Sequence, residues 1–302
     1  MNGVLIVDKP TGLTSHDVVN RVRRILQQPS VGHLGTLDPL ATGVLPLVTG
    51  NLTRLAQFYG GCEKTYEGVI RFGFATDTYD SDGEARGPAQ TVNVSLEQMR
   101  ELACRFVGLI EQMPPPFSAK KINGVPAYKL ARKNQEVALK AVQVEIKEFE
   151  IERVDGDHAS FRARVASGTY MRSIAHDMGQ QMGCGAHLQS LRRTKLGEFD
   201  LSHAHTLEEL DVACKAGKSE DFFIHPRLLL PELPCVTASE EAAALIRNGR
   251  AVNLPELSKA RQVKVFASQR ELIAIATRIA GTLFHPKIVL AAEPARQLAS
   301  KR

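Results

Sequence analysis

A dense group of turn-forming residues surrounds Asp38 and constrains this chain more than any other segment. Gly32, Gly35 and Gly43 permit backbone conformations that are closed to other residues, and Pro39 fixes the backbone directly after Asp38. The segment therefore predicts a loop that presents one carboxylate in a defined direction. A turn in which the aspartate bonds its own backbone is the simpler interpretation, and it is the commoner fate of an isolated Asp beside Pro.

Length and composition predict a folded protein with a sizeable core. At 302 residues with 43% apolar side chains, the chain has room for about two domains. The net charge of +5 is clustered, which is typical of proteins that bind a polyanion, although a solvated surface explains a charge of this size equally well. Five cysteines form no C-x-x-C pair, so neither a zinc site nor a disulfide framework is expected. No apolar run reaches the length of a signal peptide or a membrane span, which predicts a cytoplasmic protein.

Hydrophobic periodicity mixes strands and helices along the chain. An apolar run predicts a strand at 4–7, and Thr14 with Asp17 predicts a capping box that starts a helix. Further helices are predicted at 52–58, 95–110, 169–182 and 239–247, and further strands at 44–48, 66–72, 142–154, 159–166, 263–266, 271–277 and 287–290. Prolines at 114–116 precede a basic arm, and those at 231 and 234 mark a linker to a small strand-rich domain.

The sequence contains few candidate catalytic groups outside the Asp38 segment. Asp77, Asp80 and Asp82 resemble part of a calcium-binding loop, but Ala89 stands where that loop needs a bidentate Glu, so a turn is predicted. The chain has no glycine-rich dinucleotide loop, no Walker motif, no H-E-x-x-H and no G-x-S-x-G. A lone carboxylate suits nucleophilic or acid–base chemistry at a sugar or base, since an ordinary glycosidase needs a second placed carboxylate.

Several segments carry a family resemblance when they are taken together. Residues 35–43 read Gly-Thr-Leu-Asp-Pro-Leu-Ala-Thr-Gly, and Lys64-Thr65-Tyr66 forms a K-x-Y segment. Matching segments follow at 73–82, 118–132, 167–173 and 188–197, in unchanged order to about residue 200. In these motifs the chain resembles the bacterial tRNA pseudouridine synthase B family.

The resemblance implies a fold and an activity. The implied fold is the α+β pseudouridine synthase fold, with a mixed, mainly antiparallel sheet and a small C-terminal β-rich PUA-like domain. Its catalytic domain would span 1–231, with a thumb insertion at about 114–135, and the PUA-like RNA-binding domain would span 235–302. The implied reaction converts uridine-55 in the T-arm stem-loop of tRNA to pseudouridine on a flipped-out base. The implied enzyme is a monomer that needs no cofactor, no metal and no protein partner.

The resemblance also assigns roles to residues. Asp38 becomes the catalytic acid or nucleophile, and Arg172 its ion-pair partner, which favours the ionised carboxylate. Tyr66 would stack on the target base, Leu191 would pack beneath it, and His33 would support the flipped RNA. Further RNA contacts are expected at Lys9, Lys64, Lys120, Lys121, Lys129, Arg132, Arg192 and Arg193. Attack at C1′, attack at C6 and a glycal route all stay open.

Two other functions compete with this one. A non-catalytic RNA-binding protein would keep the basic surface but has no use for Asp38, Tyr66 and Arg172 together. An RNA-guided synthase of the dyskerin type shares the Asp loop but acts in a particle with guide RNA. The basic thumb segment favours the stand-alone enzyme over this second alternative.

Overall fold

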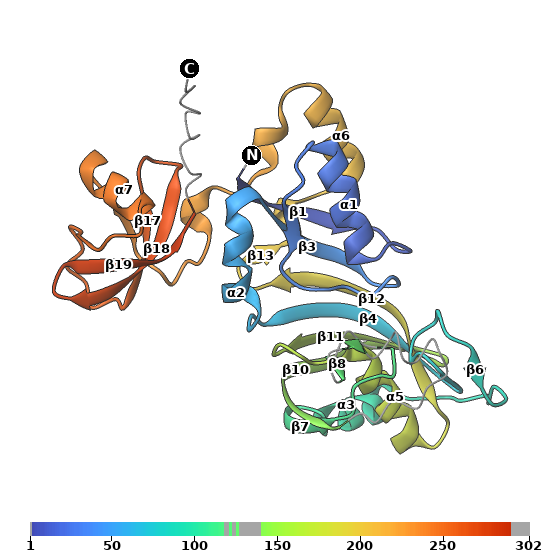
Figure 1. Cartoon of the computed structure of the whole chain (residues 1–302). Helices are drawn as coiled ribbons and strands as arrows, with labels where there is room; N and C mark the ends of the chain where they lie inside the picture. The colour runs from blue at the N-terminus through green and yellow to red at the C-terminus, as the bar shows by residue number, and fades with distance from the viewer. Residues whose placement is uncertain (1, 118–120, 123–124, 127–139, 291–302) are drawn as a thin grey trace.

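The structure, a computed structural model, describes residues 2–117, 121–122, 125–126 and 140–290 (Figure 1). In this part of the chain one large sheet contains β1 (Gly3–Lys9), β2 (Val31–His33), β3 (Thr42–Thr49), β4 (Lys64–Phe72), β7 (Gly108–Gln112), β10 (Val142–Asp155), β11 (His158–Val165), β12 (Ala186–Leu196), β13 (Phe199–Asp200) and β14 (Ala204–His205). A second sheet contains β15 (Cys235–Thr237), β16 (Val252–Asn253), β17 (Gln262–Phe266), β18 (Leu272–Ala280) and β19 (Leu283–Val289). Two small hairpins pair β5 (Ala75–Thr76) with β6 (Ala85–Arg86), and β8 (Lys121–Ile122) with β9 (Val125–Pro126).

The helices of the described residues are short. The α-helices are α1 (Ser15–Ile25), α2 (Ala56–Tyr59), α3 (Leu96–Cys104), α5 (Met171–Met182), α6 (Leu207–Lys215) and α7 (Glu240–Arg247). The 3-10 helices are η1 (Gly50–Leu55), η2 (Leu201–His203), η3 (Ser219–Phe222) and η4 (Pro226–Leu228). None of these helices is both long and apolar enough to cross a membrane.

The large sheet is mixed and mainly antiparallel. Its main path runs β14-β1-β3-β12-β4-β11-β10-β7, with β2 paired to β3 and β13 paired to β12. Among the described strands of this sheet, β1 with β14 and β3 with β12 run parallel, and the other neighbours run antiparallel. The expectation of an α+β fold with such a sheet and a C-terminal β-rich domain is confirmed.

Strand β1 is buried on both faces, which explains why its sequence is almost continuously apolar. Leu5 and Val7 pack in the cluster that contains the apolar faces of α1 and α6. Val4 and Ile6 point to the opposite face and pack with η1 and α2. The sheet therefore separates two cores and holds the loops at its strand ends rigidly.

The smaller sheet lies to one side of the large sheet (Figure 1), and its buried residues share a cluster with the larger part of the molecule. Phe266 and Ile288 share a buried cluster with Leu55 and Leu229. Arg54 of η1 donates a hydrogen bond of 2.8 Å to the Val289 carbonyl. A helix near 239–247 and strands at 263–266, 271–277 and 287–290 were expected here, and the structure confirms them with shifted ends.

Two predicted helices differ from the structure. The helix predicted at 95–110 begins with the Ser95 cap but ends at Cys104, and Gly108 (φ +103°) turns the chain into β7. A φ in this region favours glycine, so this residue marks the end of the helix better than the apolar spacing does. The helix predicted at 52–58 begins as the 3-10 helix η1 and becomes α-helical only from Ala56.

Candidate active site

The Asp38 loop connects β2 to β3 and is fixed at both ends. Ser15 at the start of α1 bonds Leu37 twice, since its Oγ accepts from the Leu37 N–H at 2.8 Å and donates to the Leu37 carbonyl at 3.1 Å. After the loop, Gly43 (φ +98°) passes so close to β12 that a Cβ would lie 2.2 Å from the Arg193 carbonyl oxygen. These constraints leave the Asp38 side chain 36% exposed at the tip of a rigid loop.

Two buried cations support this loop from beneath. Lys9 donates from Nζ to the carbonyls of Pro10, Pro39 and Ala41, at 2.9, 3.1 and 2.6 Å. Arg193 donates to three further backbone carbonyls, those of Gly35, Thr36 and Val44. Burial lowers the pKa of Lys9 to about 8 and also lowers the pKa of Arg193. Both residues were expected to contact RNA, whereas in the structure both have an exposed fraction of 0%.

Arg172 in the first turn of α5 contacts Asp38. Its Nη2 donates to Asp38 Oδ1 at 3.1 Å, and its Nε lies 2.9 Å from Asp38 Oδ2. The first contact is a charge-assisted hydrogen bond, whereas Nε forms no hydrogen bond with any described residue, so the second is an ion-pair contact only. Together they make a two-point contact between the guanidinium and the carboxylate. It fixes the orientation of the carboxylate while Asp38 keeps an exposed edge.

The Arg172 guanidinium is itself held by three more groups. It donates to the carbonyls of Thr78 at 3.2 Å and Phe117 at 2.9 Å, and its Nη1 lies 3.6 Å from Asp80 Oδ2. Only 5% of the Arg172 side chain and 6% of the Asp80 side chain are exposed. Burial raises the pKa of Asp80, whereas the Thr78 hydroxyl and Arg172 lower it. Asp80 was expected to lie in a turn and was not assigned to the site.

A cavity of about 310 Å³ opens over this ion pair. Asp38 and Arg172 line it together with Tyr66 of β4, Leu191 of β12 and Lys64. The pairing of β4 with β12 puts Tyr66 opposite Arg193 and puts Leu191 opposite Gly68, so these side chains come from adjacent strands. Burial raises the pKa of the Tyr66 hydroxyl, which therefore stays protonated at neutral pH. The structure thus gathers five of the predicted site residues around one space, namely Asp38, Lys64, Tyr66, Arg172 and Leu191. Lys64 also donates to the Cys62 carbonyl.

The other predicted site residues lie in different surroundings. His33 is the last residue of β2 and does not line the cavity. Its Nδ1 is buried without a hydrogen-bond partner among the described residues, and burial lowers the pKa of the His33 side chain. Arg192 pairs with both carboxylate oxygens of Asp8 at 3.0 and 2.7 Å. Lys120, Lys129 and Arg132 lie outside the described residues, and Lys121 is described only as backbone of β8.

The arrangement is suited to chemistry at a single carboxylate. The loop and Arg172 fix Asp38 in one orientation, so little reorganisation is needed when it reacts. Tyr66 and Leu191 provide an aromatic face and an aliphatic face beside it, which suits a planar ring. The site can therefore hold a flat heterocycle within reach of the Asp38 carboxylate.

Comparison with known proteins identifies the family of this chain. The chain matches the family model for TruB family pseudouridylate synthase, N-terminal domain, over residues 23–171, and that for the tRNA pseudouridylate synthase B C-terminal domain over residues 172–231. It is 47% identical over 293 residues to a tRNA pseudouridine synthase B of Solibacter usitatus, covering 96% of this chain and 100% of that one. It is also 40% identical over 249 residues to the protein of that name from Geobacter sulfurreducens, covering 82% of each chain.

A solved structure extends the likeness to the fold. An H/ACA ribonucleoprotein bound to a substrate RNA containing 2′-deoxyuridine includes a chain that superposes with a TM-score of 0.71 at 23% identity, covering 96% of this chain and 85% of that one. The two chains thus share a fold, although their sequence identity is too low to show this by itself. Because the two family models together match residues 23–231 and a named relative is 47% identical over 96% of this chain, the chain belongs to the TruB family of pseudouridylate synthases.

Proposed function

We propose that this chain converts uridine-55 in the T-arm of tRNA to pseudouridine, with Asp38 as the catalytic group. The ion pair between Asp38 and Arg172 on the cavity wall carries this proposal. A carboxylate held in two-point contact by a guanidinium is fixed in one orientation, which is what a nucleophile or base requires. The relatives named tRNA pseudouridine synthase B point to the same reaction.

The cavity limits the substrate to a small planar group. Its volume of about 310 Å³ is at the lower end of the range for ligand pockets, about 300–1,000 Å³. A uridine in a base-paired or stacked loop cannot reach Asp38, so the nucleotide has to be extruded, at a cost of about a few kcal/mol. Stacking of the base on Tyr66 with Leu191 on its other face offsets part of this cost.

The residues perform an isomerisation without net oxidation. The bond between N1 of uracil and C1′ of ribose breaks, the base turns while Tyr66 and Leu191 hold it, and a bond from C5 to C1′ forms. C5 then loses its proton and N1 gains one, so that the product has the same atoms as the substrate. Asp38 acts at C1′, at C6 or on the C2′ proton in the three possible routes, and each route needs its carboxylate ionised. Arg172 orients the carboxylate, and the protonated Tyr66 hydroxyl serves to position the base.

We propose that the whole chain shares in holding tRNA. Residues 1–231 form the catalytic domain in this proposal, and residues 235–302 form a PUA-like domain that contacts RNA through its backbone charge. The basic segment at about 114–135, most of which lies outside the described residues, would clamp the stem-loop. The enzyme acts in the cytoplasm as a monomer without guide RNA.

One experiment tests the function and separates it from its rivals. Purified protein is incubated with an unmodified tRNA transcript and no other component, and pseudouridine is mapped by reverse transcription after carbodiimide treatment. The proposal predicts modification at position 55 alone. Binding without modification would identify a non-catalytic RNA-binding protein, and modification that requires an added guide RNA would identify the RNA-guided type.

A further inference from the structure

Arg172 reaches Asp38 from a helix, whereas the neighbouring side chains of the proposed site come from the large sheet or its loops. Tyr66 and Leu191 lie on β4 and β12, and the Asp38 loop connects β2 to β3. Arg172 lies in the first turn of α5, so its distance from Asp38 depends on how the start of this helix is fixed to the sheet.

The start of α5 is not capped by a side chain of its own. Helices α1, α3 and α6 each begin with a capping box, in which a Ser or Thr side chain bonds the backbone of the first turn. The N-cap residue of α5 is Tyr170, and its side chain forms no capping hydrogen bond. The Tyr170 backbone is held instead from β7, by a residue 58 positions away in the sequence.

Gln112, the last residue of β7, makes this contact with both ends of its amide. Its Oε1 accepts from the Tyr170 N–H at 2.8 Å, and its Nε2 donates to the Tyr170 carbonyl at 3.1 Å. The side chain thus pairs with Tyr170 as a residue of a neighbouring strand would. Gln112 has an exposed fraction of 0% and lies opposite Val142 of β10, so these bonds join α5 directly to the large sheet.

A second hydrogen bond holds the helix just after Arg172. Ser173 Oγ donates to the Met113 carbonyl at 2.7 Å, and only 1% of Ser173 is exposed. Because Gln112 and Met113 are consecutive, the end of β7 and the residue after it fix α5 on both sides of Arg172 in the sequence.

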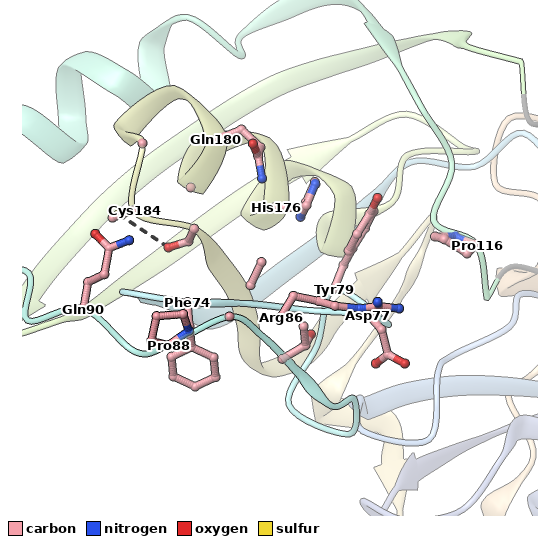
Figure 2. A pocket seen from close by; sticks show the side chains of 16 residues that line it. Phe74, Asp77, Tyr79, Arg86, Pro88, Gln90, Pro116, His176, Gln180 and Cys184 are labelled. Atoms are coloured by element: carbon pink, nitrogen blue, oxygen red, sulfur yellow. Dashed lines mark hydrogen bonds between the residues drawn. The ribbon is translucent and has the colours of Figure 1, made fainter.

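The chain beyond β7 continues past the start of α5. Pro116 lines a cavity together with His176 of α5 (Figure 2). The Phe117 carbonyl then accepts a hydrogen bond from Arg172 at 2.9 Å. The first turn of α5 is therefore joined to residues 112–117 both through its backbone and through the guanidinium that contacts Asp38.

The contacts of Gln112 supply position more than stability. A hydrogen bond between neutral groups contributes little net free energy, so an apolar side chain of the same size could fill this place at a small cost. Hydrogen bonds are directional, however, and reacting groups have to be held within about 0.5 Å by the residues behind them. Arg172 contacts the two Asp38 oxygens at 3.1 and 2.9 Å, and a shift of α5 by about 1 Å would break this geometry.

We propose that Gln112 and Ser173 are positioning residues for the isomerisation, because they hold α5 where Arg172 can orient the Asp38 carboxylate. The inference rests on the proposed function, since it gives a part in that reaction to two residues that do not line the cavity over Asp38. Their loss slows the chemical step and leaves the binding of tRNA unchanged, because neither side chain is exposed to RNA.

The test uses variants that remove these hydrogen bonds and keep the size of the side chain. Gln112→Met removes both polar atoms, Ser173→Ala removes the hydroxyl, and Ser173→Thr retains it. Tyr59→Phe is the matched control, because the hydroxyl of this buried residue donates to Glu198 at 2.8 Å and neither residue lines the cavity. Circular dichroism checks the fold, single-turnover pseudouridine formation at saturating enzyme gives the rate constant, and filter retention gives the dissociation constant for tRNA.

Gln112→Met and Ser173→Ala are each expected to lower the rate constant about tenfold to hundredfold, with the dissociation constant within about twofold of wild type. Ser173→Thr is expected to restore the rate constant, because its hydroxyl again donates to the Met113 carbonyl. Tyr59→Phe is expected to match wild type in both quantities.

An unchanged rate constant in folded Gln112→Met and Ser173→Ala would refute the positioning role and leave the proposed function standing. An equal fall in Tyr59→Phe would also refute it, because any missing buried hydrogen bond would then have the same effect. If Gln112→Met fails to fold, Ser173→Ala and Ser173→Thr decide alone, and equal rate constants in that pair overturn the proposal. Absence of pseudouridine with wild type would instead refute the proposed function.

Discussion

Arg172 lies between Asp38 and the buried carboxylate of Asp80, so we expect Arg172→Met to destabilise the fold. The substitution removes the cation between Asp38 and Asp80. Asp38 is 36% exposed and water can replace its lost partner, whereas Asp80 is only 6% exposed and keeps an uncompensated charge. Removal of one partner from a buried pair costs about 3–5 kcal/mol, and we expect the free energy of unfolding to fall by that amount at pH 8.

The loss of unfolding free energy in Arg172→Met is expected to be smaller at acidic pH, because the pKa of Asp80 rises in this variant. Burial raises the pKa of Asp80 above the value of 3.8, and Arg172 acts against this, so its removal raises the pKa of Asp80 further. The folded variant then binds a proton at pH values where the unfolded chain has released it. Stability conferred by that proton is lost as pH rises through the folded pKa, so the variant is less destabilised at pH 5 than at pH 8.

Urea unfolding followed by circular dichroism at the two pH values measures both effects. Asp80→Asn in the Arg172→Met background is expected to recover much of the loss at pH 8, because it removes the orphaned charge. Arg71→Met serves as the control, since Arg71 pairs with Asp157 at the surface, where loss of a pair costs about 1 kcal/mol or less. Equal destabilisation at both pH values, with no recovery in the double variant, would refute the role given to Asp80.

Three further predictions concern the loop, a buried acid and the RNA surface. Lys9→Met removes the donor to the Pro39 and Ala41 carbonyls and should lower the single-turnover rate constant about tenfold to hundredfold, with little change in tRNA affinity. An unchanged rate constant would contradict the positioning role of Lys9. Burial raises the pKa of Asp177 to about 6, so the ionised acid destabilises the folded chain above that pH. Asp177→Asn should therefore raise the free energy of unfolding by about 1–3 kcal/mol at pH 8 but leave it unchanged below about pH 4. An equal effect at both pH values would contradict burial as the cause. Binding of tRNA, measured by filter retention, should weaken at least tenfold between about 50 and 200 mM salt, and a flat response would count against a basic RNA clamp.

The sequence predicts local structure best where a side chain completes a backbone feature. Thr14 and Asp17 form the expected capping box at the start of α1. The same signal at Thr206 and Glu209 starts α6, which the periodicity did not single out and which this cap motif could have revealed. At Gly108 the apolar spacing continued past the point where the backbone turns, so the predicted helix was too long.

Contacts between distant segments are harder to predict from local pattern. Asp38 and Arg172 are 134 residues apart, and only the family motif placed them together. Lys9 and Arg193 show the opposite difficulty, because a basic residue that holds buried carbonyls looks the same in sequence as one that faces RNA. Asp80 was part of a matched segment, but its burial against Arg172 becomes visible only with the sheet assembled.

The central claim is that the ionised carboxylate of Asp38 performs the chemistry. Asp38→Asn keeps the size of the side chain and one oxygen for Arg172, but it removes the charge. Pseudouridine formed in a single turnover on a tRNA transcript, measured together with the dissociation constant, tests the claim most directly. The account predicts that pseudouridine formation is abolished while tRNA affinity stays close to that of wild type. Substantial pseudouridine formation by Asp38→Asn would contradict it.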